Sequence, residues 1–174
     1  MPWLHLELNG RQIRIDSIDS FNIYSWREYK TKPADWFKIK PTKCVDKYGN
    51  ITHLVALKNN KISHSYKLSR IAYKAHNPDW NITDVSQNNF IDHINNNSVD
   101  NRIENLRVIT HQQNLFNTKS KGYCWDKINN KWKAEITLNG KSKNLGRFSE
   151  EKDARQAYLT AKEKYHIMPT SQEG

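Results

Sequence analysis

Four polar residues near the middle of the chain have the types and spacing needed to hydrolyse a phosphodiester bond. Asp92 and His93 are adjacent, and Asn105 and Asn114 follow them along the chain. The reaction needs a nucleophilic water, a base that takes its proton, and a cation that stabilises charge on the phosphate and the leaving oxygen. Histidine can act as the base. The oxygens of a carboxylate and an amide, together with phosphate and water, suit a hard cation such as Mg²⁺.

A predicted strand, loop, strand and helix must position these residues. We expect a strand over residues 90–94, an asparagine-rich loop over 95–101 and a second strand over 105–109. Thr110 and Gln113 then form the capping-box pattern Thr-x-x-Gln, which indicates the start of a helix. The unit is therefore predicted to be a ββα arrangement.

Each of the four residues has an expected place in this unit. Neighbours on a strand point to opposite faces, so Asp92 and His93 can share a site only where the strand ends or bulges. The Asn105 amide can donate and accept hydrogen bonds at once, which suits it to bridging backbone groups of the loop and fixing His93. Asn114 is expected one turn into the helix, where it would bring a second oxygen ligand beside Asp92.

The residues from 92 to 107 resemble the HNH nuclease motif, specifically that of homing endonucleases. They read Asp-His-Ile-Asn-Asn-Asn-x-x-Asp-Asn-Arg-x-x-Asn-Leu-Arg, and Asn-x-x-Asn follows from residue 114. The resemblance implies that His93 is the general base and that Asn105 is the structural middle residue of the motif. It also implies that Asp92 and Asn114 hold one divalent cation, Mg²⁺ or else Mn²⁺. His93, Asn105 and Asn114 are thus the predicted catalytic residues.

Two arginines are candidates for binding the scissile phosphate. Arg70 lies on a predicted helix over residues 67–75, and Arg107 closes the motif. A planar guanidinium suits a phosphate, although a surface salt bridge is an equally good interpretation of each. Members of the family often have His-Arg on the helix before the motif, whereas Ser69 precedes Arg70 here. One active-site or phosphate contact of the family is therefore expected to be missing.

A second module is predicted after the polar stretch at residues 118–122. Its expected strands span residues 123–125, 132–138 and 142–148. A helix is expected over residues 150–165. Between Lys119 and Arg147 there are eight basic and two acidic residues, whereas the helix carries four of each. The sheet is then the DNA face of this module and the helix its back.

This module resembles an AP2/ERF-type DNA-binding domain. The resemblance rests on Gly122-Tyr123-x-Trp125, Trp132-Lys133-Ala134-Glu135-Ile136, Leu145-Gly146-x-Phe148 and the alanine-rich helix. It implies that the sheet contacts DNA, while Ala134, Ile136 and Leu138 face the helix. The predicted DNA-binding residues of the chain are Arg70, Arg107, Trp125, Lys133, Glu135, Thr137, Lys141, Lys143 and Asn144. The family reads DNA largely through arginine and tryptophan, and many matching positions differ here, so we expect weaker sequence readout.

The N-terminal region is predicted to be rich in β-structure. Apolar residues alternate with polar ones over residues 4–18 around Asn9-Gly10, which predicts a hairpin. Residues 20–29 are aromatic-rich and are interpreted as a short helix. Further strands are expected over residues 36–40, 43–46 and 51–57. The stretch from Ile15 to Trp26 is similar to what precedes the nuclease in homing endonucleases that also carry the second module.

The overall composition favours a nucleic-acid partner. The net charge is +10 and the isoelectric point is about 9.6, which suits a polyanion, with an anionic membrane surface as the competing interpretation. No apolar run is long enough to span a bilayer, and no signal-peptide core follows Met1. Cys44 and Cys124 have no CxxC partner, so neither a structural zinc nor a disulfide is expected. We expect a cytoplasmic protein, in the host cytoplasm if it is encoded by a phage.

The sequence therefore predicts an α+β protein with two domains. An N-terminal β-rich region and a ββα-metal nuclease core at about 90–117 make up residues 1–118, an AP2-like domain of three antiparallel strands and one helix spans 119–167, and a tail spans 168–174. The predicted function is a metal-dependent endonuclease that nicks or cuts duplex DNA, as a monomer or weak dimer and without a small-molecule cofactor. The alternatives are a catalytically inactive DNA-binding regulator and an RNA-processing enzyme. Competition between duplex DNA and RNA would separate the last of these.

Overall fold

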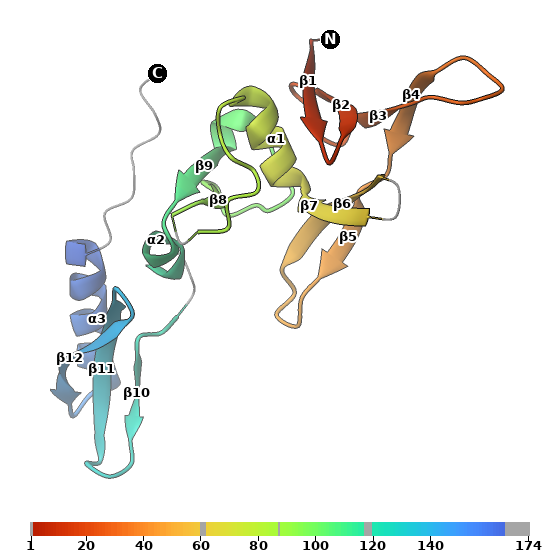
Figure 1. Ribbon diagram of the computed structural model, residues 1–174. Helices are drawn as coiled ribbons and strands as arrows, with labels where there is room; N and C mark the ends of the chain where they lie inside the picture. The colour runs from red at the N-terminus through yellow and green to blue at the C-terminus, as the bar shows by residue number, and fades with distance from the viewer. Residues whose placement is uncertain (1, 60–61, 87, 117–119, 166–174) are drawn as a thin grey trace. The chain divides into compact units, whose positions relative to one another are not determined.

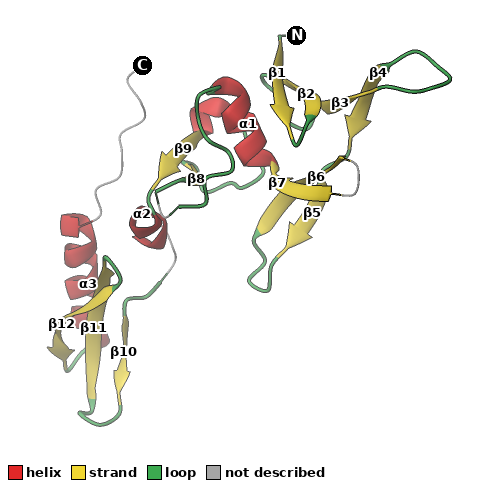
Figure 2. Cartoon of the chain, in the orientation of Figure 1, coloured by secondary structure: helices red, strands yellow, loops and turns green. Residues whose placement is uncertain are grey.

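The computed structural model describes residues 2–59, 62–86, 88–116 and 120–165 (Figure 1). The described part consists mostly of strands with a few helices, arranged in several small sheets (Figure 2). This mixture is compatible with the predicted α+β class. The chain divides into two compact units, the first made of Met1–Val85 and Ile91–Val108, the second of Ser86–Phe90 and Ile109–Gly174.

The first unit begins with a four-stranded sheet in which each strand pairs with the next. Its strands are β1 (Trp3–Leu8), β2 (Arg11–Asp16), β3 (Ile23–Arg27) and β4 (Asp35–Ile39), and neighbours are antiparallel. Asn9 and Gly10 join β1 to β2 with φ of 52° and 66°, the left-handed conformation that a two-residue hairpin turn requires. The predicted hairpin is confirmed.

The helix expected over residues 20–29 is wrong, because this segment contains β3. Ile23 and Ser25 are buried, whereas Tyr24 and Trp26 are half-buried on the opposite face. This alternation has the period of a strand, and β-branched and aromatic side chains fit a half-buried sheet.

A second sheet follows, made of β5 (Thr42–Val45), β6 (Ile51–Asn59) and β7 (Ile62–Lys67). The strands predicted over residues 43–46 and 51–57 are confirmed, and β7 is an additional strand. Helix α1 (Leu68–His76) continues directly from β7, in agreement with the helix predicted over 67–75. Residues 60–61 of the turn expected between β6 and β7 lie outside the described residues.

One apolar core joins these elements. It takes the inward side chains of the first sheet, two residues of β6, and the buried stripe of α1. The largest fully buried side chains in this unit are Ile13, Ile15, Ile23, Val55, Leu68 and Ile71. Because α1 packs in this core, the position of its C-terminal end is fixed, and the chain that leads on to the site residues begins from that position.

The predicted order of strand, loop, strand and helix is present in the middle of the chain. Strands β8 (Phe90–His93) and β9 (Leu106–Ile109) pair, a 3₁₀ turn (Ile103–Asn105) leads into β9, and α2 (His111–Phe116) follows. The Thr110 hydroxyl accepts a bond from the Gln113 N–H at 3.1 Å, and the Gln113 side-chain oxygen accepts one from the Thr110 N–H at 2.8 Å. The predicted capping box is thus confirmed.

The second unit is built on a three-stranded sheet. It contains β10 (Tyr123–Asp126), β11 (Lys131–Leu138), β12 (Lys141–Phe148) and α3 (Glu151–Tyr165), all close to their predicted positions. Ala134 and Ile136 of β11 are buried on the face that α3 covers, and Leu138 packs against the same cluster. This confirms the expected orientation of the central strand.

Helix α2 is tied to this C-terminal sheet. The Gln112 side-chain amide donates to the Thr137 carbonyl at 2.8 Å and accepts from the Asn139 N–H at 2.7 Å. These bonds lie within the second unit, to which α2 belongs. The domain boundary expected after residue 118 stays a prediction. Residues 117–119 and the predicted tail over 168–174 lie outside the described residues.

Candidate active site

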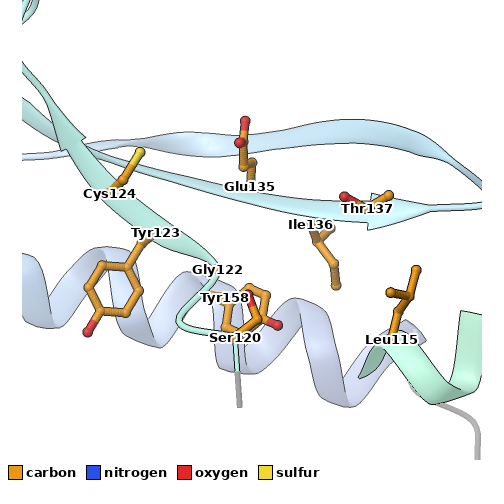
Figure 3. A pocket seen from close by; sticks show the side chains of 9 residues that line it. All are labelled: Leu115, Ser120, Gly122, Tyr123, Cys124, Glu135, Ile136, Thr137 and Tyr158. Carbon is orange, nitrogen blue, oxygen red and sulfur yellow. The ribbon is translucent and has the colours of Figure 1, made fainter. Parts of the chain in front are cut away.

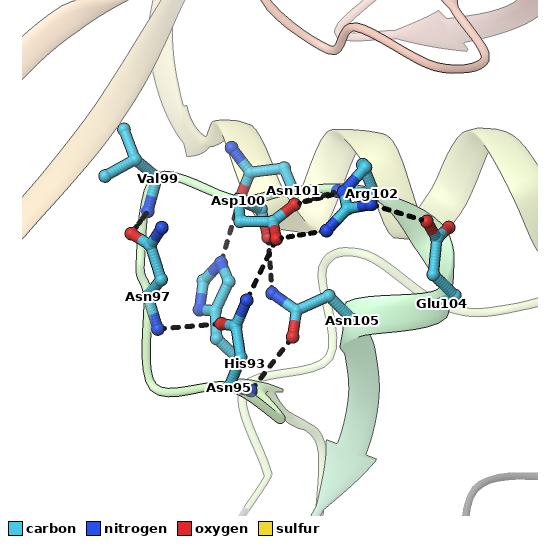
Figure 4. Close-up of polar contacts among 9 residues, drawn as sticks. All are labelled: His93, Asn95, Asn97, Val99, Asp100, Asn101, Arg102, Glu104 and Asn105. Carbon is cyan, nitrogen blue, oxygen red and sulfur yellow. Dashed lines mark hydrogen bonds and ion pairs between the residues drawn. The ribbon is translucent and has the colours of Figure 1, made fainter.

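The loop between β8 and β9 is closed by the side chain of Asn105 (Figure 4). This residue is only 5% exposed. Its amide oxygen accepts the Asn95 N–H at 2.9 Å, and its amide nitrogen donates to the Asp100 carbonyl at 2.7 Å. The bridging expected of the Asn105 amide is therefore present, and it joins the two ends of the loop.

Asp100 closes the loop a second time through its carboxylate. It accepts bonds from the Asn95 amide at 2.9 Å and from the Arg102 guanidinium at 2.8 Å (Figure 4). The Arg102 bonds are the main cause that holds the pKa of Asp100 far below its usual range. The Asp100 carboxylate is therefore ionised at neutral pH. Its bonds to Asn95 and Arg102 are kept there, and they hold the loop closed.

His93 ends β8 and is oriented by Asn101. The ring nitrogen Nε2 lies 2.9 Å from the Asn101 amide oxygen, and Asn101 is only 6% exposed (Figure 4). An oxygen in this position accepts a hydrogen bond, so with the amide oriented this way Nε2 carries the proton. The lone pair is then on Nδ1, which becomes the nitrogen that can take a proton from water.

Asp92 is half-buried and paired with Arg107. The Arg107 guanidinium donates from Nε at 2.9 Å and from Nη2 at 2.8 Å to one carboxylate oxygen. The side chains are 10% and 19% exposed, respectively. Arg107 was expected either to bind the scissile phosphate or to form a salt bridge, and the salt bridge is present. The partner of Arg107 in this bridge is Asp92, the predicted metal ligand.

The donor set fits a hard cation held by few protein ligands. Among the described residues, no group of three or more histidines, cysteines or carboxylates gathers closely enough to hold a metal ion. Carboxylate and amide oxygens, with phosphate and water, are ligands that Mg²⁺ commonly takes. A cation at Asp92 stays a prediction.

Asn114 lies on α2 in the second unit and is half-buried. Its backbone N–H donates to the Thr110 carbonyl at 2.9 Å, which belongs to the first turn of the helix. Its expected position beside Asp92 stays a prediction.

Arg70 packs against the loop that follows α1. Its guanidinium donates to the carbonyls of Ile82 at 2.6 Å and Asp84 at 3.0 Å, and its central carbon lies 4.6 Å from the centroid of the Trp80 ring. Desolvation by burial lowers its pKa. These contacts favour a structural role for Arg70 over binding of the scissile phosphate.

The outer face of the C-terminal sheet carries several of the predicted DNA-binding residues. Cys124, Glu135 and Thr137 point away from α3, beside an open pocket that Tyr123, Ile136 and Tyr158 line from the helix side (Figure 3). Lys133 lies opposite Cys124 in the register, and its ammonium is 2.5 Å from the Glu135 carboxylate.

A bulge at Leu145 of β12 accompanies this arrangement. The pairing with β12 shifts between Ala134 and Glu135, and the Glu135 N–H donates to the Gly122 carbonyl at 2.9 Å. Gly122 has φ of 70°, and a Cβ there would lie 2.0 Å from the Tyr158 ring. Only glycine fits between the sheet and α3 at this point.

Four other predicted contacts of this module lie near its margins. Lys143 donates to the Tyr165 hydroxyl of α3 at 2.8 Å, which lowers the pKa of that hydroxyl, so Lys143 reaches the helix side of the sheet. Lys141 and Asn144 are exposed on β12. Trp125 is 44% exposed and packs edge-on against Trp132.

Sequence reasoning missed the two residues that support His93 most directly. Asn101 lies in the asparagine-rich loop that the sequence predicts, and Asp100 belongs to the quoted motif, but neither is among the predicted site residues. Their signal in the sequence is the run Asp-Asn-Arg at residues 100–102, which places an acceptor, an amide and a cation together. The structure of the loop is needed to show which hydrogen-bond partner each of these three residues has.

One comparison with known protein families covers the sequence around this loop. Residues 66–115 match the HNH endonuclease family. The match runs from β7 to α2 and includes the whole loop around His93, so it supports a nuclease that acts on DNA. The AP2/ERF resemblance stays a prediction.

The chain is also similar to Protein 3.8 of Escherichia phage T7. The two are 29% identical over 91 residues, which cover 47% of this chain and 75% of the phage protein. No solved structure matches the chain. In the described part of the protein, no helix has both the length and the apolar character needed to cross a bilayer.

Proposed function

We propose that this protein is a metal-dependent DNA endonuclease of the homing HNH type, which hydrolyses phosphodiester bonds in duplex DNA. The observation that carries the proposal is the match of residues 66–115 to HNH endonucleases, within which a buried asparagine orients the ring of His93. The similarity to a phage protein supports a phage origin and action in the host cytoplasm.

In this proposal His93 is the general base. Asn101 holds Nε2, so that Nδ1 takes the proton of the attacking water. Asn105 and Asp100 keep the loop closed and so fix the distance between the base and the DNA backbone. These two act as positioning residues, because neither needs to touch the reacting atoms.

Asp92 and Asn114 are the proposed ligands of the divalent cation, Mg²⁺ or else Mn²⁺. When bound, the cation supplies positive charge to the scissile phosphate and the leaving oxygen. Arg107 holds the Asp92 carboxylate in place, and its guanidinium is a candidate second contact for phosphate.

The decisive test is nicking of supercoiled plasmids that carry DNA from around the gene's own locus. We expect conversion to the open-circular form in Mg²⁺ or Mn²⁺ and none in EDTA. A monomer with one site would give nicks first, and linear product would then require a dimer or a second event. Binding to the same DNA without cleavage in any metal would instead support the catalytically inactive regulator.

We further propose that the outer face of the C-terminal sheet binds the duplex. The supporting observations are the excess of basic residues over β10–β12, the outward direction of Glu135 and Thr137, and α3 packed on the opposite face. Lys133 and Arg147 are directly opposite each other on this outer face, where each could neutralise a phosphate.

Replacing Lys133 tests this surface. Lys133→Ala should weaken duplex binding severalfold and lower the slope of log affinity against log salt by about one, because one counterion fewer is released. The matched control is Lys152→Ala, which removes the same charge from an exposed position of α3. Equal losses in both variants, measured by fluorescence anisotropy over a salt series, would refute the assignment of the face.

A further inference from the structure

Aromatic side chains gather on the face of the first sheet that points away from the core. Alternate residues of a strand point to opposite faces, so the strand register defines this set. We call it the aromatic platform, and its members are Trp3, His5, Arg14, Tyr24, Trp26, Trp36 and Lys38. The tryptophan and tyrosine rings are half-buried. Nothing in the proposed nuclease chemistry uses them.

Arg14 lies at the centre of the platform. Its guanidinium carbon is 4.7 Å from the ring centroids of Trp3 and Trp36 and 4.9 Å from that of Tyr24. A cation over aromatic faces is stabilised by the ring quadrupoles. Because Arg14 already occupies the space over these three rings, the platform is not a cage for a cationic ligand.

The positive charges of the platform have no anionic partner within the described residues. The ion pairs found among the described residues involve neither Arg14 nor Lys38. The Arg14 Nε is buried and has no hydrogen-bond partner in the same part of the chain. The carboxylates on this face, Glu7 and Asp16, lie at the ends of the β1–β2 ladder. Asp16 accepts bonds from backbone N–H groups of the loop that follows it, which lower its pKa.

The platform continues into an open groove. Trp26 packs edge-on against Trp36, with ring centroids 5.4 Å apart, and also lines a groove of about 550 Å³. Arg11, Arg27, Glu28 and Tyr29 line the same groove. It opens where β2 and β3 part, since their pairing stops at Ile13 and Ser25. Cations and aromatic rings thus continue from the middle of the sheet into the groove, where Glu28 adds one carboxylate.

We propose that the aromatic platform binds a single-stranded segment of DNA, with an unpaired base stacked on the exposed part of Trp26. Phosphates of that segment would lie near Arg14 and Lys38. Rings on a sheet suit unpaired bases, because stacking needs access to the flat face of a base and a duplex hides those faces. This surface is separate from the duplex-binding face proposed on the C-terminal sheet.

The test compares the full-length protein with variants by anisotropy, using a labelled oligothymidylate and a labelled duplex, both in EDTA so that no cleavage is needed. Trp26→Ala should weaken binding of the single strand about tenfold and leave binding of the duplex unchanged. Trp26→Phe keeps a stacking ring and should retain most of the affinity. The control is Tyr48→Ala, which removes an aromatic that is 77% exposed in the turn between β5 and β6.

Several outcomes would overturn the proposal. The first is that the wild-type protein does not bind the single strand. The others are that Trp26→Ala binds the single strand as tightly as wild type, or that it loses as much affinity for the duplex as for the single strand. The platform would then suit a protein partner instead. If Trp26→Ala does not fold by circular dichroism, crosslinking of the wild-type protein to a strand containing 5-iododeoxyuridine decides. Crosslinks in peptides that contain Tyr24, Trp26 or Trp36 would support the proposal, and crosslinks confined to other peptides would refute it. Because EDTA is present throughout, the result does not depend on nuclease activity.

Discussion

His93→Ala should reduce plasmid nicking by at least about a hundredfold while leaving the affinity for duplex DNA unchanged. Loss of a positioned general base commonly costs about a hundredfold to ten-thousandfold in rate. The side chain contributes no apolar packing to the core, and its described bond is to the Asn101 side chain. The fold should therefore survive the substitution, and single-turnover nicking in Mg²⁺ measures the effect on the reaction itself.

The matched control is His64→Ala, which removes an exposed histidine of β7 in the same unit. It should cleave as fast as wild type. Added imidazole should restore part of the activity of His93→Ala, since a free base can enter the space that the ring leaves. Cleavage by His93→Ala at the wild-type rate would show that the proton acceptor lies elsewhere.

Asn105→Ala should damage both stability and cleavage, because one buried side chain closes the loop from both ends. The substitution leaves the Asn95 N–H and the Asp100 carbonyl without their partner. Unsatisfied or newly hydrated groups of this kind cost about 1–3 kcal/mol of unfolding free energy. We expect a loss in this range by urea denaturation and at least a tenfold slower nicking reaction, since His93 then loses its fixed position.

Asn97→Ala is the control for this experiment. Asn97 lies in the same loop, is exposed, and accepts one bond from the Val99 N–H at 3.2 Å. Its loss should change stability by less than about 0.5 kcal/mol. Asn105→Asp adds a sharper comparison, because it keeps the acceptor for Asn95 but turns a negative oxygen toward the Asp100 carbonyl. It should be no more active than Asn105→Ala, and full activity in either variant would contradict the positioning role.

Local sequence signals predicted the parts of the fold that local chemistry determines. Asn9-Gly10 predicted a hairpin because both residues tolerate positive φ. Thr110 with Gln113 predicted a helix start because the side chain of each can accept a hydrogen bond from the backbone N–H of the other. The chemistry of the Asn105 amide likewise predicted how it bridges the loop.

Contacts between distant segments could not be predicted in the same way. β3 was interpreted as a helix because its aromatic residues match either period over so short a stretch, and the strands beside it decide the outcome. The attachment of α2 to the C-terminal sheet depends on Gln112 meeting a carbonyl 25 residues away. The aromatic platform depends on a register across β1–β4, which no single segment contains.

The closing of the active-site loop also bears on the order in which the protein assembles. The side-chain bonds that close it join residues at most 10 positions apart, whereas the bond from the Asn9 side chain to the Leu57 carbonyl joins residues 48 apart. Loops of about ten residues close within roughly 10–100 ns, and contacts of large separation form later because more chain entropy must be lost first. The loop that carries His93 can therefore form early in folding, before the two N-terminal sheets have packed against each other.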